Sequence, residues 1–338
     1  MEEKYRELSQ RVGLGGALRA PKLFAMLADE READLLLALP ADVPALAQKT
    51  GRPQAEVQAA VELLFHKGLV FKSFKTEPIS YRMCNNPVQF HDATILWPEA
   101  PREFLDLWQE FQETEILELQ KAFAEVAPRP VMRVIPVGVT MEVKNKVLAH
   151  EDVKEIIEAA EILAVTKCTC KLTAHKCDTT LECCLQLNNS ARYALARGTG
   201  RELTKPEAIE LMKKLELEGL IHTVNNLKSV KQVICNCCSC CCQNFPGFIH
   251  HNINSVDPSR FTAAIDAELC VGCETCLGRC FFGAIAMVEE DGRTTAQISN
   301  PAKCMGCGLC QVVCPSEAIT LRETRDRDFI PDSWSVTH

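Results

Sequence analysis

The chain has 338 residues, of which 47% are hydrophobic and 24% charged, so it holds enough apolar material for a globular protein of two or three domains. Its net charge of -8 gives no global indication of nucleic acid or an anionic membrane as a partner. The N-terminus lacks the pattern of a signal peptide, and no apolar stretch approaches the roughly 20 residues of a membrane-spanning helix. We therefore expect a cytoplasmic protein without membrane insertion.

Residues 1–95 have the pattern of a small helical domain that ends in a β-prone stretch. Apolar residues recur at helical spacing in PKLFAMLADEREADLLLAL, and two further helical segments, DVPALAQKT and QAEVQAAVELLFHK, flank the turn GRP. KGLV then leads into a β-prone stretch that ends near YRM. Over about residues 15–84 this order resembles the winged-helix modules of small bacterial regulators, which implies that the second helix of the pair enters a DNA groove.

The charge of this region argues against DNA as its partner. Residues 1–90 contain 12 Lys and Arg against 11 Asp and Glu, a net charge of +1, and the second helix has two glutamates and a single lysine near its end. A DNA-binding protein needs a clustered basic face to neutralise phosphates. We expect this domain to pack or to dock against protein, and a redox-sensing winged-helix regulator remains an alternative.

A linker and one long amphipathic helix are predicted at residues 96–129. Pro101, at the end of LWPEAP, is well placed to start the helix. An apolar stripe runs along the helix, formed by Phe104, Leu107, Trp108 and Phe111 and then by Ile116, Leu119, Phe123 and Val126. Such a stripe must be buried, either within the chain or in a homodimer.

An α/β cysteine-rich domain is predicted at residues 130–258, beginning with a strand in PRPVMRVIPV. Its early thiol group consists of Cys168, Cys170, Cys177, Cys183 and Cys184. Its late thiol group consists of Cys235, Cys237, Cys238, Cys240, Cys241 and Cys242. Between the groups, residues 185–234 have the pattern of two helices and a strand, with Thr204 as an N-cap and Glu207 three residues later. Cys84 stands alone and is interpreted as a small buried hydrophobe.

The eleven thiols of this domain predict a metal-binding site, because clustered cysteines in a reducing compartment are more often metal ligands than partners in disulfides. We expect the intervening segment to fold back so that both groups share a site. Eleven thiols allow two 4Fe–4S clusters, or one cluster and a zinc site, since thiolates suit both metals. Iron–sulfur is favoured, with Cys170, Cys177, Cys183 and one late thiol as the first ligand set. The lone or adjacent histidines His175, His250 and His251 are expected to be exposed rather than ligands.

The last part, residues 259–338, repeats the spacing C-x2-C-x2-C-x3-C. The first copy contains Cys270, Cys273, Cys276 and Cys280, and the second contains Cys304, Cys307, Cys310 and Cys314 followed by Pro315. Over about residues 260–322 the repeat resembles the bacterial two-cluster ferredoxin domain. The resemblance implies one 4Fe–4S cluster on Cys270, Cys273, Cys276 and Cys314, and another on Cys304, Cys307, Cys310 and Cys280. Phe281 replaces the family's usual proline, which leaves the ligands intact and alters the turn after Cys280.

The sequence thus predicts an α+β multidomain protein: a winged-helix-like domain, a long connecting helix, a cysteine-rich α/β domain and a ferredoxin-like domain with two 4Fe–4S clusters. The order of its cysteine blocks resembles that of iron–sulfur proteins of strict anaerobes. The predicted function is transfer of single electrons to or from a partner oxidoreductase or enzyme complex. A reductase acting on a small substrate at the middle-domain cluster is the other alternative, although the sequence contains no dinucleotide fingerprint, P-loop or HExxH motif.

Overall fold

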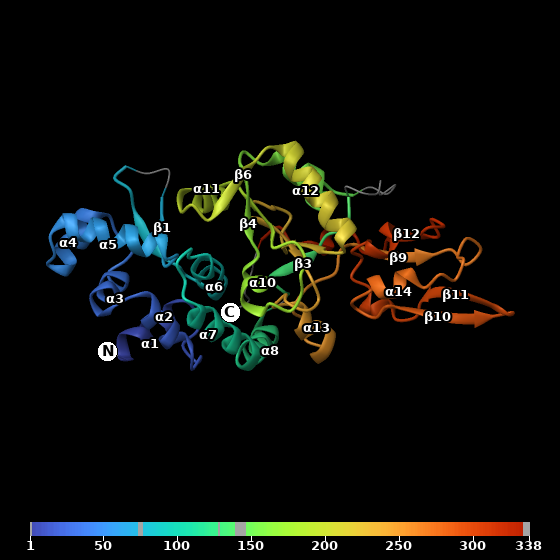
Figure 1. Ribbon diagram of the computed structural model, residues 1–338, viewed down its shortest axis with the longest axis horizontal. Coiled ribbons are helices and arrows are strands. Elements are labelled where there is room, and N and C mark those ends of the chain that lie inside the picture. Colours follow the sequence, from blue (N-terminus) through green and yellow to red (C-terminus); the bar gives the residue numbers. More distant parts are fainter. Residues whose placement is uncertain (1, 74–76, 128, 139–146, 334–338) are drawn as a thin grey trace. The chain divides into compact units, whose positions relative to one another are not determined.

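The structure is a computed structural model that describes residues 2–73, 77–127, 129–138 and 147–333 (Figure 1). Part of the predicted β-prone stretch, residues 74–76, and the end of the predicted tail, residues 334–338, therefore lie outside the described residues. The described chain is an α+β protein with several small sheets, and it divides into two compact units. The first unit comprises residues 1–117, 172–174 and 196–199, and the second comprises the rest.

Five helices and a short strand pair open the first unit. Asp29 caps α3 and Glu32 completes its capping box, so the first apolar stretch of the chain forms two helices. Gly51, in the left-handed conformation with φ 66, ends α4. β1 pairs with β2 in antiparallel fashion, and the winged-helix identity of this region stays a prediction. The elements are α1 (Glu2–Arg11), α2 (Ala20–Leu27), α3 (Glu30–Leu37), α4 (Val43–Thr50), α5 (Gln54–His66), β1 (Val70–Lys72) and β2 (Tyr81–Met83).

The sequence predicts one long connecting helix, and that prediction is wrong. Two helices, α7 (Arg102–Thr114) and α8 (Ile116–Val126), are separated at Glu115, whose backbone leaves the helical conformation. The Glu115 carboxylate accepts hydrogen bonds from the Leu18 backbone and the Arg19 guanidinium, at 2.6 and 2.7 Å. Phe104, Trp108 and Phe111 of the stripe are buried in α7, whereas α8 has no buried residue. A further helix, α6 (Pro87–Ile95), precedes the linker.

An antiparallel six-stranded sheet, the middle sheet, organises the second unit in the order β3-β7-β8-β5-β4-β6. The predicted helix and strand pattern of residues 185–234 is confirmed by α11, α12 and β7, and Thr204 with Glu207 forms the capping box of α12. The strands are β3 (Met132–Val134), β4 (Leu163–Lys167), β5 (Glu182–Leu187), β6 (Gly200–Leu203), β7 (Ile221–Asn225) and β8 (Val233–Cys237). The helices are α9 (Val153–Ala159), α10 (Thr169–Ala174), α11 (Asn189–Ala196), α12 (Lys205–Glu218) and α13 (Phe245–His251).

The C-terminal lobe, residues 261–323, contains two antiparallel strand pairs, two short α-helices and one turn of 3-10 helix at Pro301–Lys303 (Figure 1). β9 pairs with β12, the first and last strands of the lobe, and β10 pairs with β11. This arrangement closes the lobe on itself, because its two ends lie side by side. The elements are β9 (Phe261–Ile265), α14 (Thr275–Arg279), β10 (Ile285–Glu290), β11 (Arg293–Ile298), α15 (Leu309–Val312) and β12 (Ile319–Glu323).

An apolar cluster joins the C-terminal lobe to the middle sheet within the second unit. Val134 and Ile221 of the sheet pack in one buried cluster with residues of the lobe, among them Phe282 and Met305. Phe245 of α13 meets Phe282 edge-on, with ring centroids 5.3 Å apart. The lobe and the sheet therefore share a core, and the thiols of both regions are held on one compact body.

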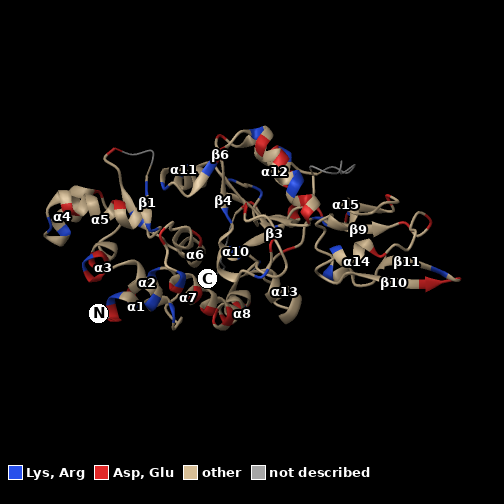
Figure 2. Cartoon of the chain, viewed as in Figure 1, with Lys and Arg blue, Asp and Glu red and all other residues tan. Residues whose placement is uncertain are grey.

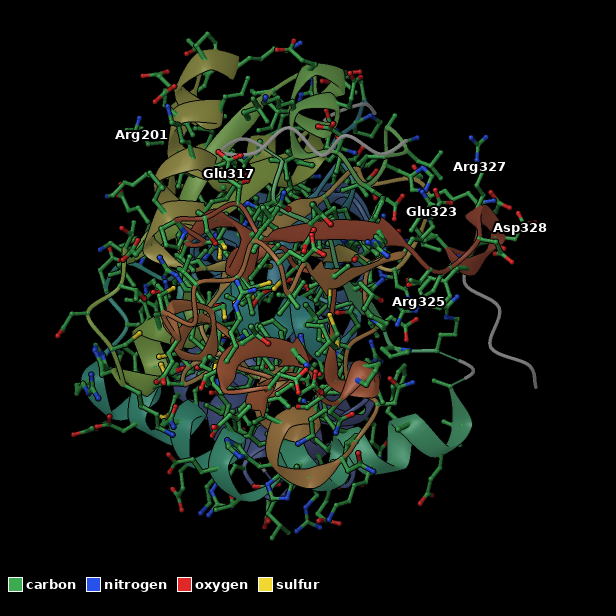
Figure 3. All side chains as sticks on the ribbon, turned by 90° about the vertical axis from the view of Figure 1, so that its right-hand side faces the viewer. Arg201, Glu317, Glu323, Arg325, Arg327 and Asp328 are labelled. Atoms are coloured by element: carbon green, nitrogen blue, oxygen red, sulfur yellow. The ribbon has the colours of Figure 1, made fainter. Side chains whose placement is uncertain are left out.

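Charged groups on this body are mostly mixed in sign. Figure 2 shows acidic and basic residues interspersed along α12. Arg260 is fully buried and donates to the carboxylates of Glu151 and Glu323, at 2.7 and 2.5 Å. Glu323 and Arg325 lie on the same side of the lobe (Figure 3). Arg325 donates to the Ser259 carbonyl oxygen at 2.8 Å, so this side of the lobe is held by buried and half-buried guanidinium groups.

Candidate metal centres

Strand pairing brings the early and late thiol groups together. β5 carries Cys183 and Cys184, β8 carries Cys235 and Cys237, and the two strands are neighbours in the middle sheet with Leu185 opposite Ile234. The early group begins after the end of β4, where Cys168 precedes the first residue of α10. The expectation that the intervening segment folds back on itself is therefore confirmed.

A tight cluster of four thiols, the Cys177 cluster, combines one early and three late cysteines. Its Sγ atoms all lie within 4.8 Å of one another, and they belong to Cys177, Cys238, Cys240 and Cys241. Cys177 lies 3.7 Å from both Cys238 and Cys241, and Cys240 lies 3.6 and 3.8 Å from the same two sulfurs. All four cysteines are free, so these are contacts between separate thiols and not disulfides.

Hydrogen bonds make Cys177 the most acidic member of this cluster. Burial alone would raise its pKa, but the hydroxyl and the backbone N–H of Thr179, together with neighbouring thiols, lower the pKa of Cys177 to about 7. Burial raises the pKa of Cys238 to about 12. Metal binding to such thiols requires that they lose their protons.

A second cluster, the Cys168 cluster, is formed by Cys168, Cys183 and Cys184, whose Sγ atoms also lie within 4.8 Å of one another. Hydrogen bonds from Cys170 and from its two partners hold the pKa of Cys168 well below its usual value. Cys235 is a hydrogen-bond neighbour of Cys184 and extends the cluster into the late group.

A buried lysine accompanies the Cys168 cluster. Lys171 donates from Nζ to the Cys183 sulfur at 3.4 Å and to the Thr180 carbonyl oxygen at 2.8 Å. Burial acts to lower its pKa, but the charges of Cys183, Cys168 and Cys238 outweigh burial and raise the pKa of Lys171. A positive charge is therefore fixed beside thiols that carry or develop negative charge.

The remaining late thiols form a pair, in which Cys242 is buried and Cys237 is half-buried. The pKa of Cys242 is raised well above its usual value, first by its hydrogen bond to Cys237 and then by burial. The Thr223 hydroxyl lies 3.5 Å from the Cys237 sulfur. All eleven thiols of this region are therefore close to at least one other thiol or polar partner.

The expected first ligand set of the middle region is not assembled. Cys177 joins three late thiols, whereas Cys183 and Cys170 group with Cys168. The reason is a β-bulge: Thr166 pairs with Cys184 and Lys167 with Glu182, so Cys183 is an extra residue in β5. A bulge re-aims side chains, which lets two consecutive cysteines approach Cys168. The three candidate histidines, His175, His250 and His251, belong to neither cluster of the described residues.

The thiols of the C-terminal lobe are spaced differently. A cavity in the lobe is lined by residues that include Cys280, Cys304, Cys307 and Cys310. Burial is the largest cause that raises the pKa of Cys276, and the charges of Cys270, Cys273 and Cys314 raise it further. These four thiols are therefore neighbours. Among the described residues, no three of these eight sulfurs come within 4.8 Å of one another.

Backbone N–H groups point at several of these sulfurs. Ala296 donates to Cys270 and Ala263 to Cys304, both at 3.4 Å, and Ala284 donates to Cys280 at 3.3 Å. Such bonds stabilise the charged form of a sulfur ligand. Gly283 closes the turn after Cys280 by donating to its carbonyl oxygen at 3.1 Å, and the neighbouring Phe281 packs half-buried against the apolar cluster. Elsewhere, Cys84 is buried, as expected, and burial raises its pKa to about 12.

Comparison with known proteins identifies the C-terminal lobe. Residues 263–321 match the family described as the 4Fe-4S dicluster domain. An archaeal-type glutamate synthase (NADPH) from Thermotoga maritima is 34% identical over 82 residues, which is 24% of this chain and 15% of that protein. One component of an ion-translocating oxidoreductase complex from Methanosarcina acetivorans is 35% identical over 74 residues, 22% of this chain and 26% of that protein.

A smaller relative is also similar. Ferredoxin-3 from Nostoc sp. is 28% identical over 75 residues, 18% of this chain and 77% of its own length. The chain thus spans about a sixth of the glutamate synthase and about a quarter of the oxidoreductase component. These similarities support iron–sulfur clusters and electron transfer at a general level. Within the part of the chain that the structure describes, every helix is too short or too polar to cross a membrane.

Proposed function

We propose that the protein transfers single electrons through two 4Fe–4S clusters in its C-terminal lobe, to or from a partner oxidoreductase. The observation that carries this proposal is the cavity lined by Cys280 of the first repeat together with Cys304, Cys307 and Cys310 of the second. A ligand set that crosses between the repeats is the arrangement of two-cluster ferredoxins. It supports clusters on Cys280, Cys304, Cys307 and Cys310, and on Cys270, Cys273, Cys276 and Cys314.

The chain's own groups fit such clusters. Each set supplies four thiols at a spacing wider than that of a single-ion site, and backbone N–H groups point at Cys270, Cys280 and Cys304. A bound 4Fe–4S cluster takes up and releases one electron at a time. The N–H donors and the burial of the site tune the potential at which it does so.

The first repeat is the side on which a partner would exchange electrons. Of the eight thiols of the lobe, all of which the structure describes, Cys273 is exposed and the other seven are buried or half-buried. Leu269 and Val271 flank Cys270 and are 52% and 65% exposed, so apolar surface surrounds the loop that carries Cys273. The names of two relatives, a glutamate synthase and a component of an oxidoreductase complex, support an oxidoreductase as the partner.

The test uses the intact chain purified without oxygen. We expect about eight irons in the C-terminal lobe, from two clusters of four, and an EPR spectrum of two coupled spins after reduction. Cys273→Ser should lose up to about four irons and slow reduction of a one-electron dye acceptor, while Cys84→Ser, which alters a buried thiol of the first unit, should change neither. An intact protein that carries about eight irons but exchanges no electrons with any one-electron acceptor would contradict the proposal.

A further inference from the structure

We infer that the Cys177 cluster, formed by Cys177, Cys238, Cys240 and Cys241, is a closed tetrahedral site for a single zinc ion. This site is separate from the clusters of the C-terminal lobe. The inference goes beyond the proposed function and does not depend on it, because the two rest on different cysteines.

The sulfur spacing fits one metal ion at the centre of a tetrahedron. A zinc–thiolate bond is about 2.3 Å long, so the sulfurs at the corners of a regular tetrahedron lie about 3.8 Å apart. The four measured edges of the Cys177 cluster are 3.6, 3.7, 3.7 and 3.8 Å. The remaining two pairs also fall within 4.8 Å.

A 4Fe–4S cluster does not fit the same sulfurs. Its four irons and four sulfides stand between the thiolates, so the thiolates must lie farther apart than around a single ion. The C-terminal lobe provides an internal comparison, because its eight thiols match a 4Fe–4S domain and no three of these described sulfurs lie within 4.8 Å of one another. The Cys177 cluster is therefore too compact for the iron–sulfur cluster that the sequence favoured.

The local backbone is built like a zinc-binding turn. Cys238 and Cys241 have C-x2-C spacing, which is typical of structural zinc sites, and they follow directly after β8. The Cys241 backbone N–H donates to the Cys238 sulfur, and the Lys176 backbone N–H donates to the Cys241 sulfur. Thr179 contacts the Cys177 sulfur at 3.1 Å. These outer hydrogen bonds orient the ligands and delocalise their negative charge.

Four protein ligands leave no position for water or a substrate, which is the mark of a structural rather than a catalytic zinc site. For one and the same ligand set, zinc also binds more tightly than ferrous iron. The ion would fasten the segment after α10, which carries Cys177, to the turn after β8. The proposed site therefore stabilises the fold and takes no electrons.

The test measures metals in the intact protein. Zinc and iron per chain are determined after purification without oxygen, and zinc X-ray absorption is recorded on the unmodified protein. We expect zinc to be present, with four sulfur neighbours at about 2.3 Å. The double variant Cys177→Ser/Cys240→Ser should lose one zinc per chain and keep all its iron. These two cysteines are chosen because they are the less buried members of the cluster. Cys84→Ser serves as the matched control and should lose neither metal.

Several results would contradict the zinc site, and each can be told apart from the others. Loss of about four irons from the double variant would overturn the inference and assign the cluster to iron–sulfur, and unchanged zinc would overturn it as well. A single iron in place of zinc, with a rubredoxin-like spectrum, would also contradict it. If the double variant fails to fold, X-ray absorption of the unmodified protein still decides, since zinc with oxygen or nitrogen neighbours excludes a four-thiolate site. None of these results bears on whether the C-terminal lobe carries two clusters.

Discussion

Arg279 donates from Nη1 to the backbone carbonyl oxygen of Glu218, at 2.9 Å. Its Nη2 also donates to the Leu217 carbonyl oxygen at 2.5 Å. Arg279 ends α14, the helix that carries Cys276, and Glu218 ends α12, which packs in the same unit as the middle sheet. A cation at the last turn of a helix satisfies carbonyls that have no partner within the helix. The Arg279 side chain thus links α14, which carries Cys276, to the end of α12.

Gly219→Ala should break this link. Gly219 has φ +95, and a Cβ atom there would lie 1.9 Å from Arg279 Nη1. The alanine would strain the backbone by about 1–3 kcal/mol and would also displace the Arg279 guanidinium. We expect a lower midpoint of thermal unfolding than in Gly292→Ala. Gly292 also has a positive φ, +75, but nothing lies within 4 Å of its added Cβ. Equal midpoints in the two variants would contradict a role for Arg279 here.

Arg260→Met should be strongly destabilising. The Glu151 carboxylate would remain buried without its cation, and removing one partner of a buried pair costs about 3–5 kcal/mol. The double variant Arg260→Met/Glu151→Leu should recover a large part of that loss, since an apolar replacement removes both charges of the pair together. Lys121→Ala, which removes the exposed pair with Glu118, is the control and should change the free energy of unfolding by less than about 1 kcal/mol. The measurement is the free energy of unfolding of the second unit, obtained by denaturant unfolding of the intact protein under anaerobic conditions.

His150 should make the protein less stable in mild acid. Burial, and then the charges of Arg133 and Arg260, lower its pKa from 6.5 to about 4. In the unfolded chain His150 takes up its proton near pH 6.5, so its contribution to stability is complete above that pH and is lost as pH falls toward about 4. His150→Gln cannot titrate. The drop in unfolding midpoint between pH 7 and pH 5 should therefore be smaller in this variant than in the unmodified protein, and equal drops would contradict the assignment.

The intact protein should not bind DNA specifically. α5, the helix that the winged-helix resemblance would place in a DNA groove, contains Glu56 and Glu62 and no Lys or Arg within Gln54–His66 (Figure 2). With few phosphates neutralised, non-specific binding should be weak and should disappear at physiological salt. A footprint at that salt that depends on cluster oxidation would favour the regulator alternative. Fluorescence anisotropy with random and upstream DNA fragments measures this.

Features formed by neighbouring residues can be predicted from the sequence alone. The spacing of Cys270, Cys273 and Cys276 indicates a shared site, because a loop holds nearby ligands whatever the rest of the fold does. The capping box at Thr204 and Glu207 was likewise readable, since all its partners lie within one turn. Both are properties of a few consecutive residues.

The partition of the middle thiols could not be predicted in the same way. Regular alternation in a strand would send Cys183 and Cys184 to opposite faces, and the bulge that brings both to Cys168 depends on pairing with β4. The separation of α7 from α8 is also invisible in the amphipathic pattern. Glu115 is held by Leu18 and Arg19, almost 100 residues earlier in the chain.

The pairing of β5 with β8 has a consequence for how the chain reaches its native state. A slip of one residue between these strands would turn Cys235 and Cys237 to the other face of the sheet and carry Cys238, Cys240 and Cys241 away from Cys177. Only the correct register brings the late thiols of the Cys177 cluster to Cys177, so a metal ion bound there stabilises one alignment of β5 and β8 over the neighbouring ones. Metal available during synthesis would then favour the native register, and chains made without metal would populate the competing registers more.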